Sequence, residues 1–315
     1  PLYTTTTITA QGAVAIYDKT DSWQISQVIV NPHFGTSLAT KTDNFGYSVS
    51  LGIDSMVIGF PNDAYDDTDT NVATGAGSVY LYTRGDSGWT IEQKIVGWGQ
   101  DRNSGDLLGA AIWYQDGYAF LGAPGHAYDV NGTNYLAGAG AVFIWQWSGT
   151  AWTYVEKITA SNRYAGDGFG STIAGDTGIL AIGSPTATLD VSGLNSTANA
   201  GSVSIFNYVN GNWTFTQEIV ASTRNINDGF GTSISVSGND ILVGMPTNST
   251  STTNSYSTTY ANCGAAEFFT LSSGSWTFVN RVFAGDNRTS GDMFAASVSV
   301  NSGVAIIGAP LHTYD

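Results

Sequence analysis

The chain has 315 residues, of which 42% are hydrophobic and 11% charged, and its formal net charge is −15. This length accommodates one large all-β domain or two ordinary ones, and the apolar content supports a sizeable core. The negative charge argues against binding to a nucleic-acid backbone or an anionic membrane surface, and no apolar stretch approaches the roughly 20 residues of a membrane span.

The single cysteine, Cys263, cannot form a disulfide framework, and we expect it to be buried and inert rather than a link to another chain. Glycine is abundant at 39 residues, whereas proline is scarce at 7. Such a composition is typical of many short strands joined by turns. No signal peptide is visible, and from the start at Pro1 we expect that the chain has been processed or cut.

The first predicted element is a hairpin over residues 12–30, in which a polar turn joins an apolar run to a second run led by tryptophan. Both runs alternate or are rich in β-branched and aromatic residues, and Gly, Asn, Asp and Ser bound them, as expected for strands. The same half-unit returns four times along the chain. Its five tryptophans are Trp23, Trp89, Trp152, Trp213 and Trp276.

A second half-unit alternates with the first and runs from a Phe-Gly pair to a Gly-x-Pro step, as in DNFGYSVSLGIDSMVIGFP at 43–61. Its copies recur every ~63 residues, and a fixed period predicts a repeat architecture. Each copy contains two further strand-like runs joined by a tight turn. The lead positions are Phe45, Leu108, Phe169, Phe230 and Phe294, and the copies end at Pro61, Pro124, Pro185, Pro246 and Pro310.

Four antiparallel strands per repeat, here named A to D, are the signature of a β-propeller blade. The chain starts with strands C and D and ends with strands A and B. We therefore predict an all-β fold, a five-bladed β-propeller of four-stranded antiparallel blades, whose ring is closed by N-terminal strands C and D pairing with C-terminal strands A and B. A window cut from a longer array is the alternative. The predicted single domain, 1–315, has blades at about 31–96, 97–160, 161–221, 222–284, and 285–315 plus 1–30.

The half-units resemble FG-GAP repeats, the propeller repeats also found in integrin α-subunit heads. The resemblance rests on D-x-F-G-x-S, on the Gly-x-Pro step, and on G-x-V followed by Trp, and it covers nearly the whole chain. It implies an extracellular or cell-surface propeller that serves adhesion or ligand recognition. In integrins, calcium loops of the D-x-D-x-D-G type lie between Phe-Gly and Gly-Ala-Pro, whereas here that connection is a tight turn such as SLGIDSM.

The recurring residues are interpreted as structural. Each lead Phe should wedge between neighbouring blades, each Gly-x-Pro step should end strand B, and each Trp should cover the flank of a blade. An aspartate stands two residues before each lead position and should order the D–A loop through an Asx turn. These aspartates are Asp43, Asp106, Asp167, Asp228 and Asp292.

Candidate ligand-binding residues lie mainly in the long loops between strands B and C, because long loops on a rigid scaffold commonly carry function. Tyr, His and Asp recur there, and they either form a ring that binds a cation or a sugar, or serve only to pack and cap the loops. Trp98 lies in a D–A loop without a Trp counterpart in the other repeats, where it could stack on a sugar. The candidates are Trp98, Tyr65, His126, Tyr128, His312 and Tyr314.

Oxygen-rich runs in the same loops suggest Ca²⁺, the one cofactor that the sequence points to, because oxygen ligands at alternating positions suit this ion. The run DAYDDTDTN nevertheless lacks the turn glycine and the distal glutamate of an EF-hand loop. The candidate metal ligands are Asp63, Asp66, Asp67, Asp69, Asp129 and Asn131.

Two surface signals remain. Arg-Gly-Asp at 84–86 matches a cell-attachment tripeptide for integrins, but it falls at a C–D turn, where Gly, Asp and Ser are favoured for backbone reasons. Five N-x-S/T sequons are candidates for glycosylation, although about as many are expected by chance in a chain this rich in Ser and Thr. They lie at Asn131, Asn195, Asn212, Asn248 and Asn287, all in predicted loops.

The predicted strands A contain no Asp, Glu, His or Lys, so no acid–base pair can be placed near the propeller axis and we expect no enzyme. The predicted function is an extracellular or cell-surface, non-enzymatic recognition or adhesion module that binds a glycan or an extracellular protein through the long-loop face. A structural subunit that assembles with copies of itself into an extracellular fibre or coat is the alternative. A glycosidase-like propeller enzyme is a lesser one. Neither nucleic-acid binding nor membrane insertion is expected.

Overall fold

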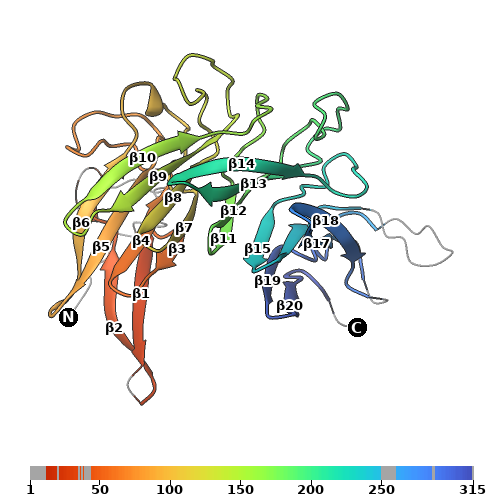
Figure 1. Ribbon diagram of the computed structural model, residues 1–315. Coiled ribbons are helices and arrows are strands. Elements are labelled where there is room, and N and C mark those ends of the chain that lie inside the picture. Colours follow the sequence, from red (N-terminus) through yellow and green to blue (C-terminus); the bar gives the residue numbers. More distant parts are fainter. Residues whose placement is uncertain are drawn as a thin grey trace. The chain divides into compact units, whose positions relative to one another are not determined.

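The computed structural model describes residues 12–19, 21–34, 36, 38, 44–249, 260–285 and 288–313 (Figure 1). Within these residues nearly all regular structure is β-strand, and the 3₁₀ turn η1 (Gly99–Asp101) is the one helical element. No helix in this part of the chain has the length and apolarity that crossing a membrane requires. The chain divides into two compact units, residues 1–126 with 143–157 and residues 127–142 with 158–315.

Two four-stranded antiparallel sheets, blades 1 and 2, lie wholly or mostly in the first unit. In both, strands that are neighbours in sequence are neighbours in the sheet, as expected for strands joined by hairpins. Blade 1 consists of β3 (Val49–Leu51), β4 (Ser55–Phe60), β5 (Ser78–Gly85) and β6 (Gly88–Val96). Blade 2 consists of β7 (Ala111–Gln115), β8 (Tyr118–Ala123), β9 (Ala141–Trp147) and β10 (Trp152–Ile158).

The second unit contains blades 3 and 4, which have the same strand order. Their C–D hairpins each carry a β-bulge at the same place, after Ile205 in blade 3 and after Phe268 in blade 4, which increases the local twist. Blade 3 consists of β11 (Thr172–Asp176), β12 (Ile179–Ser184), β13 (Ser202–Val209) and β14 (Asn212–Ile219). Blade 4 consists of β15 (Ser233–Ser237), β16 (Asp240–Met245), β17 (Ala265–Ser272) and β18 (Ser275–Val282).

Two further hairpins are half-blades. The N-terminal half-blade, β1 (Ala13–Lys19) with β2 (Trp23–Val30), belongs to the first unit, and the C-terminal half-blade, β19 (Ser297–Asn301) with β20 (Val304–Gly308), to the second. In the described sheets, β1 and β20 each have one hydrogen-bonded neighbour, whereas the equivalent strands of complete blades have two. The fold is therefore all-β, with antiparallel four-stranded sheets, and it fits a β-propeller-like fold, while five blades and a closed ring remain predictions.

The glycine that precedes strand C makes the junction to the next repeat. Gly201, with φ +85°, forms a parallel bridge with Phe230, whose side chain is fully buried. A Cβ on this glycine would collide with the backbone of Phe230, so no other residue fits there. Such a buried side chain between successive blades is the wedge that the sequence predicts. The equivalent bridges are Gly77 with Leu108, Gly140 with Phe169, and Gly264 with Phe294.

The repeated tryptophans lie on the blades as expected, with one exception. Trp89, Trp152, Trp213 and Trp276 are buried, whereas Trp23 in the N-terminal half-blade is 65% exposed. Cys263 is 1% exposed and free, which confirms the prediction of a buried thiol.

The aspartates before the lead positions do order the D–A loops, but not through the predicted Asx turn. Asp43 lies outside the described residues, and each of the other four carboxylates reaches back and accepts a hydrogen bond from the amide three residues earlier. The amide of Asn103 donates to Asp106 Oδ2 at 2.7 Å, and that of Tyr164 to Asp167 Oδ2 at 2.8 Å. The same bond recurs at Asp228 and Asp292.

Candidate functional site

One aspartate holds the tip of the long B–C loop in each of blades 1 to 3. In residues 61–77, Asp66 Oδ1 accepts hydrogen bonds from the amides of Thr68 at 3.2 Å and Thr70 at 2.9 Å, and its Oδ2 accepts one from the side chain of Asn71. Burial opposes ionisation of Asp66, but these bonds outweigh it and lower the pKa of the carboxyl. Asp129 with Thr133, and Asp190 with Asn195, repeat the arrangement in the next two loops.

An arginine from the following D–A loop latches each of these tips, a contact that the sequence analysis missed. Arg102 Nη2 donates to the carbonyl oxygens of Ala64 at 2.7 Å and Asn71 at 3.0 Å. The sequence did contain a signal for this contact, because an arginine stands four residues before the aspartate of the D–A loop in four repeats. The equivalent bonds are Arg163 to Ala127 at 2.7 Å and Asn134 at 3.2 Å, and Arg224 to Thr188 at 2.9 Å and Asn195 at 3.2 Å.

The base of the first long loop is an ion-pair network rather than a set of free carboxylates. Lys94 Nζ lies 3.1 Å from Asp63 Oδ2 and 2.9 Å from Asp69 Oδ1. His33 Nε2 lies 3.1 Å from the same Asp69 oxygen. Ser78 donates a further hydrogen bond to Asp63 at 2.6 Å. Two of the predicted metal ligands are thus paired with a lysine from the sheet below.

His126, a predicted ligand-binding residue, is fully buried below the second long loop. Its Nε2 lies 3.3 Å from Asp101 Oδ1 and its Nδ1 3.3 Å from Asp106 Oδ2, and Lys157 forms an ion pair with Asp101. Burial disfavours the charged imidazole, but its hydrogen bonds to the two aspartates outweigh this and raise the pKa of His126 above the ordinary 6.5. The imidazole thus lies between two carboxylates that favour its charged form.

The stability that His126 contributes should be lost as the pH rises. A histidine whose folded pKa is raised stabilises the fold below its unfolded pKa, and that contribution disappears as the pH rises through the folded pKa. We expect the unfolding free energy of the native chain, relative to His126→Asn, to be largest below about pH 6.5 and to decline above it. Asparagine is a suitable replacement because Asn248 occupies the equivalent position in blade 4. Urea unfolding at several pH values measures this, and a difference that does not vary with pH would contradict it.

The other predicted His and Tyr candidates pack against neighbouring side chains. The ring of Tyr65 meets His33 edge-on at 5.4 Å, and that of Tyr128 meets Tyr135 edge-on at 5.3 Å. His312 Nδ1 lies 3.1 Å from Asp292 Oδ2. These contacts favour the second of the two predicted roles, in which the residues pack and cap the loops. Tyr314 lies outside the described residues.

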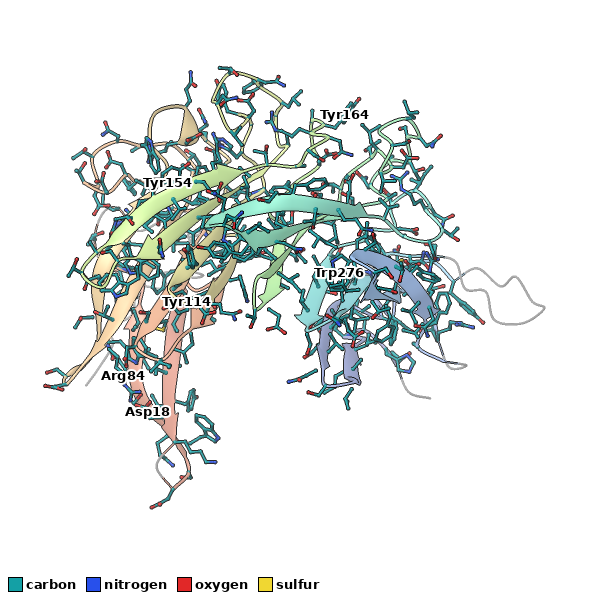
Figure 2. All side chains as sticks on the ribbon, viewed as in Figure 1. Asp18, Arg84, Tyr114, Tyr154, Tyr164 and Trp276 are labelled. Carbon is teal, nitrogen blue, oxygen red and sulfur yellow. The ribbon has the colours of Figure 1, made fainter. Side chains whose placement is uncertain are left out.

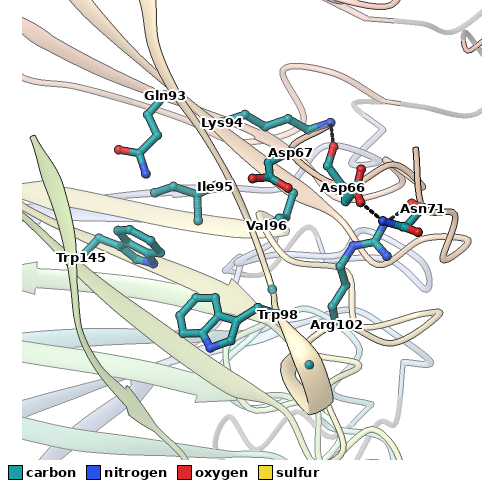
Figure 3. Close-up of a pocket in the computed structure, with 12 residues that line it drawn as sticks. Asp66, Asp67, Asn71, Gln93, Lys94, Ile95, Val96, Trp98, Arg102 and Trp145 are labelled. Carbon is teal, nitrogen blue, oxygen red and sulfur yellow. Dashed lines mark hydrogen bonds between the residues drawn. The ribbon is translucent and has the colours of Figure 1, made fainter. Parts of the chain in front are cut away.

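A cavity of about 440 Å³ does bring Trp98 together with the first loop tip (Figure 3). Trp98 is 46% exposed, and its ring meets Trp145 edge-on at 6.0 Å and Tyr154 at 4.9 Å. Figure 3 shows the two indole rings on one side and the tip aspartate with its arginine on the other. The residues that line the cavity include Asp66, Asp67, Asn71, Gln93, Lys94, Trp98, Arg102 and Trp145.

The walls of this cavity are fixed before any ligand arrives. Lys94 Nζ donates to the carbonyl oxygen of Asp66 at 2.8 Å, and Arg102 holds the same loop from the other side. Of the predicted metal ligands, Asp67 has an exposed side chain on the cavity wall. Aromatic faces beside amide and carboxylate groups are the usual components of a carbohydrate site.

No group of three or more His, Cys, Asp or Glu residues suited to holding a metal exists in the described part of the chain. Asp129 is engaged by its own loop amides, including that of Asn131 at 3.2 Å, and these bonds lower the pKa of its carboxyl. Of the predicted calcium ligands in the long loops, four carboxylates therefore already have protein partners, those of Asp63, Asp66, Asp69 and Asp129.

The sequons differ in accessibility. Asn131 and Asn195 lie on exposed loop tips, whereas Asn212 is exposed at the start of β14 and not in a loop. The prediction of a glycosylation site at Asn248 is wrong. This residue is fully buried and its Nδ2 donates to Asp228 at 2.7 Å, which leaves no room for a glycan on that nitrogen in the folded chain. Asn287 lies outside the described residues.

The Arg-Gly-Asp tripeptide lies at the β5–β6 turn, as predicted. Arg84 pairs with Asp18 of β1 at 3.3 Å, and Figure 2 shows the two side chains near each other at the ends of their hairpins. The guanidinium thus has a partner within the first unit.

Comparison with known protein families shows which repeat the chain contains. A model of the FG-GAP repeat matches residues 33–82, 152–206 and 213–259. The chain therefore carries FG-GAP repeats. The matched segments contain the Phe-Gly to Gly-x-Pro half-units of blades 1, 3 and 4, together with the latch arginines Arg163 and Arg224. No curated protein matches this FG-GAP chain.

Solved structures share the fold at low identity. A Bacteroides uniformis protein proposed to be a 6-phosphogluconolactonase is 11% identical with a TM-score of 0.51, over 88% of this chain and 66% of that one. A Lactobacillus plantarum protein is 12% identical with a TM-score of 0.47, over 86% of this chain and 65% of that one. The FG-GAP chain thus spans just under two thirds of these structures. The first likeness supports the propeller architecture only.

Proposed function

We propose that this FG-GAP repeat protein is an extracellular, non-enzymatic recognition module that binds a glycan in the Trp98 cavity. The observation that carries the proposal is an exposed indole beside a pre-formed wall of polar groups, at 46% exposure for Trp98 and about 440 Å³ for the cavity. The apolar face of a sugar stacks on an aromatic ring, while its hydroxyls bond to amide and carboxylate groups such as Gln93 and Asp67. A rigid wall limits the entropy lost on binding.

Trp98→Ala should weaken glycan binding about tenfold or more, because the stacking surface is lost. The native chain is first screened on a glycan array, and the affinity of the best glycan is then measured by calorimetry for both proteins. Tyr164→Ala is the matched control, since Tyr164 is an aromatic of similar exposure, 51%, in the D–A loop of another repeat. Equal losses in the two variants, or no glycan bound by the folded native chain, would reject the proposal.

Ring closure is part of the proposed architecture. Ile306 of β20 is 73% exposed, while Leu242 at the equivalent position of β16 is fully buried. Tyr17 of β1 is 51% exposed, while the equivalent Phe269 is 4% exposed. Both strands thus lack the neighbour that covers their counterparts. We propose that β20 and β1 of one chain pair in the register of the complete blades, which removes both open edges.

Self-assembly remains the second candidate, favoured by the same open edges. If β20 pairs with β1 of another copy, the contact is head-to-tail and produces a fibre rather than a ring. The enzyme alternative has weaker support. Strand β11 extends one residue beyond the predicted strand to Asp176, but its carboxylate accepts a hydrogen bond from the Gly238 amide at 2.7 Å and has no acidic partner in the inner strands that the structure describes.

A further inference from the structure

Blade 3 differs from its neighbours at one buried position beneath the long loops. The residue two positions after the Gly-x-Pro proline is His126 in blade 2 and Asn248 in blade 4, and each contacts the aspartate of its D–A loop. Asn248 Nδ2 donates to Asp228 Oδ1 at 2.7 Å. In blade 3 this residue is Ala187, which has no donor to offer.

The D–A loop aspartate of blade 3, Asp167, therefore has no side-chain donor at this position. Asp167 is 4% exposed, and its Oδ2 accepts the hydrogen bond from the Tyr164 amide. Its Oδ1 is buried without a hydrogen bond, and burial outweighs the effect of the Tyr164 and Thr188 amides on the carboxyl, so that the pKa of Asp167 is raised to about 6. A buried carboxylate oxygen without a donor is costly and points to a ligand.

The basic side chain that lies near this position in other blades is also replaced in blade 3. Lys157 in blade 2 forms an ion pair with the half-buried Asp101, and Arg281 in blade 4 forms one with the buried Glu267 at 2.7 Å. The residue at this position of blade 3 is Glu218, whose carboxylate accepts hydrogen bonds from Asn162 Nδ2 at 2.9 Å and from the Ser202 hydroxyl. Blade 3 therefore has a second acid where its neighbours have a base.

Small hydroxyl side chains surround these acids. Ser204 lies opposite Glu218 in the β13–β14 ladder, where blade 2 has the ring of Phe143. Ser184 lies opposite Ser202, and its buried hydroxyl makes no hydrogen bond. Because cross-strand neighbours and residues two apart share a face of a sheet, the oxygens of Ser184, Ser204 and Glu218 are on one side of blade 3.

We propose that Asp167, Glu218, Ser184 and Ser204 form a calcium site in blade 3. The two carboxylates balance the charge of a divalent cation, and the hydroxyls add the neutral hard oxygens that Ca²⁺ accepts, with water completing six to eight ligands. Arg163 acts on Asp167, and Arg224 on Glu218, through charge alone, because their Nη2 atoms donate to main-chain carbonyls. This site lies in blade 3 and contains only two acids, whereas the aspartate run lies in the first long loop.

Calcium should raise the melting temperature of the EDTA-treated native chain by about 5 °C at 100-fold excess over the dissociation constant. Asp167→Asn should abolish the rise, because the amide cannot supply the charge. Asp228→Asn is the matched control in blade 4 and should keep it, since Asp228 already has Asn248 as its partner. Isothermal calorimetry with CaCl₂ alone should give one site in the native chain and none in Asp167→Asn.

A second variant keeps the test valid if Asp167→Asn folds poorly. Ala187→His with Glu218→Lys copies blade 2, so it should stay folded by circular dichroism and show no calcium response. An unchanged calcium response in this variant or in Asp167→Asn would overturn the proposal, as would the lack of any response in the folded native chain. Glycan binding at Trp98 is a separate measurement in the other unit, and its failure does not bear on this result.

Discussion

Gly201→Ala should lower the unfolding free energy of the chain by about 4 kcal/mol. The new Cβ would collide with the backbone oxygen, nitrogen and carbonyl carbon of Phe230, none of which can move without breaking the bridge between blades 3 and 4. The residue must also keep φ at +85°, a conformation that side chains rarely adopt. Urea unfolding followed by tryptophan fluorescence measures the change.

Gly193→Ala separates the two contributions. Gly193 has φ +70° in the long loop of the same blade, but a Cβ there would meet no atom within 4 Å. This variant should lose only the conformational term, about 1 kcal/mol. If both substitutions cost the same, the close approach of the glycine to Phe230 is not what makes the junction specific.

Ala305→Cys with Tyr17→Cys, made in a Cys263→Ala background, should form an intramolecular disulfide. The B–C ladders of complete blades pair Met56 with Tyr82 and Ile241 with Phe269, and the same register places Ala305 opposite Tyr17. A bridge across a loop this long should stabilise the chain by about 5 kcal/mol. Mass spectrometry under non-reducing conditions, with size-exclusion chromatography, detects the monomeric bridged product.

Ala305→Cys with Asp18→Cys tests the register. A shift of one residue turns the second side chain to the other face of the sheet, so this pair should stay reduced. Bridges that form only between molecules would instead support self-assembly through the half-blades. An equal yield in both pairs would show that the half-blades meet without the register of the complete blades.

The strands could be predicted from the repeat because local and long-range signals agree. Each Gly-x-Pro step and each tryptophan recurs with the same spacing, and the ladders of blades 3 and 4 follow those limits closely. The pairing of the two half-blades could not be settled in this way. It depends on a contact between distant parts of the chain, for which a repeat predicts the register but not the partner molecule.

The candidate site was visible in the sequence only where one repeat departs from the others. Trp98 stands out because no other D–A loop has a tryptophan at that place. Trp145 could not be found, since it lies within an apolar strand and reads as core, yet it lines the same cavity. Ala187 was also missed, because a missing side chain produces no motif, although its effect on Asp167 appears once neighbouring blades are compared.

The arginine latches of blades 1 to 3 fix the position of the long loops without depending on the side chains at the loop tips. Arg102, Arg163 and Arg224 bind only main-chain oxygens at the two ends of a loop tip, so any side chain is compatible with the latch between those ends. Surface residues there can diversify freely while the loop keeps its place. Residues at these tips can therefore be exchanged without new folding solutions.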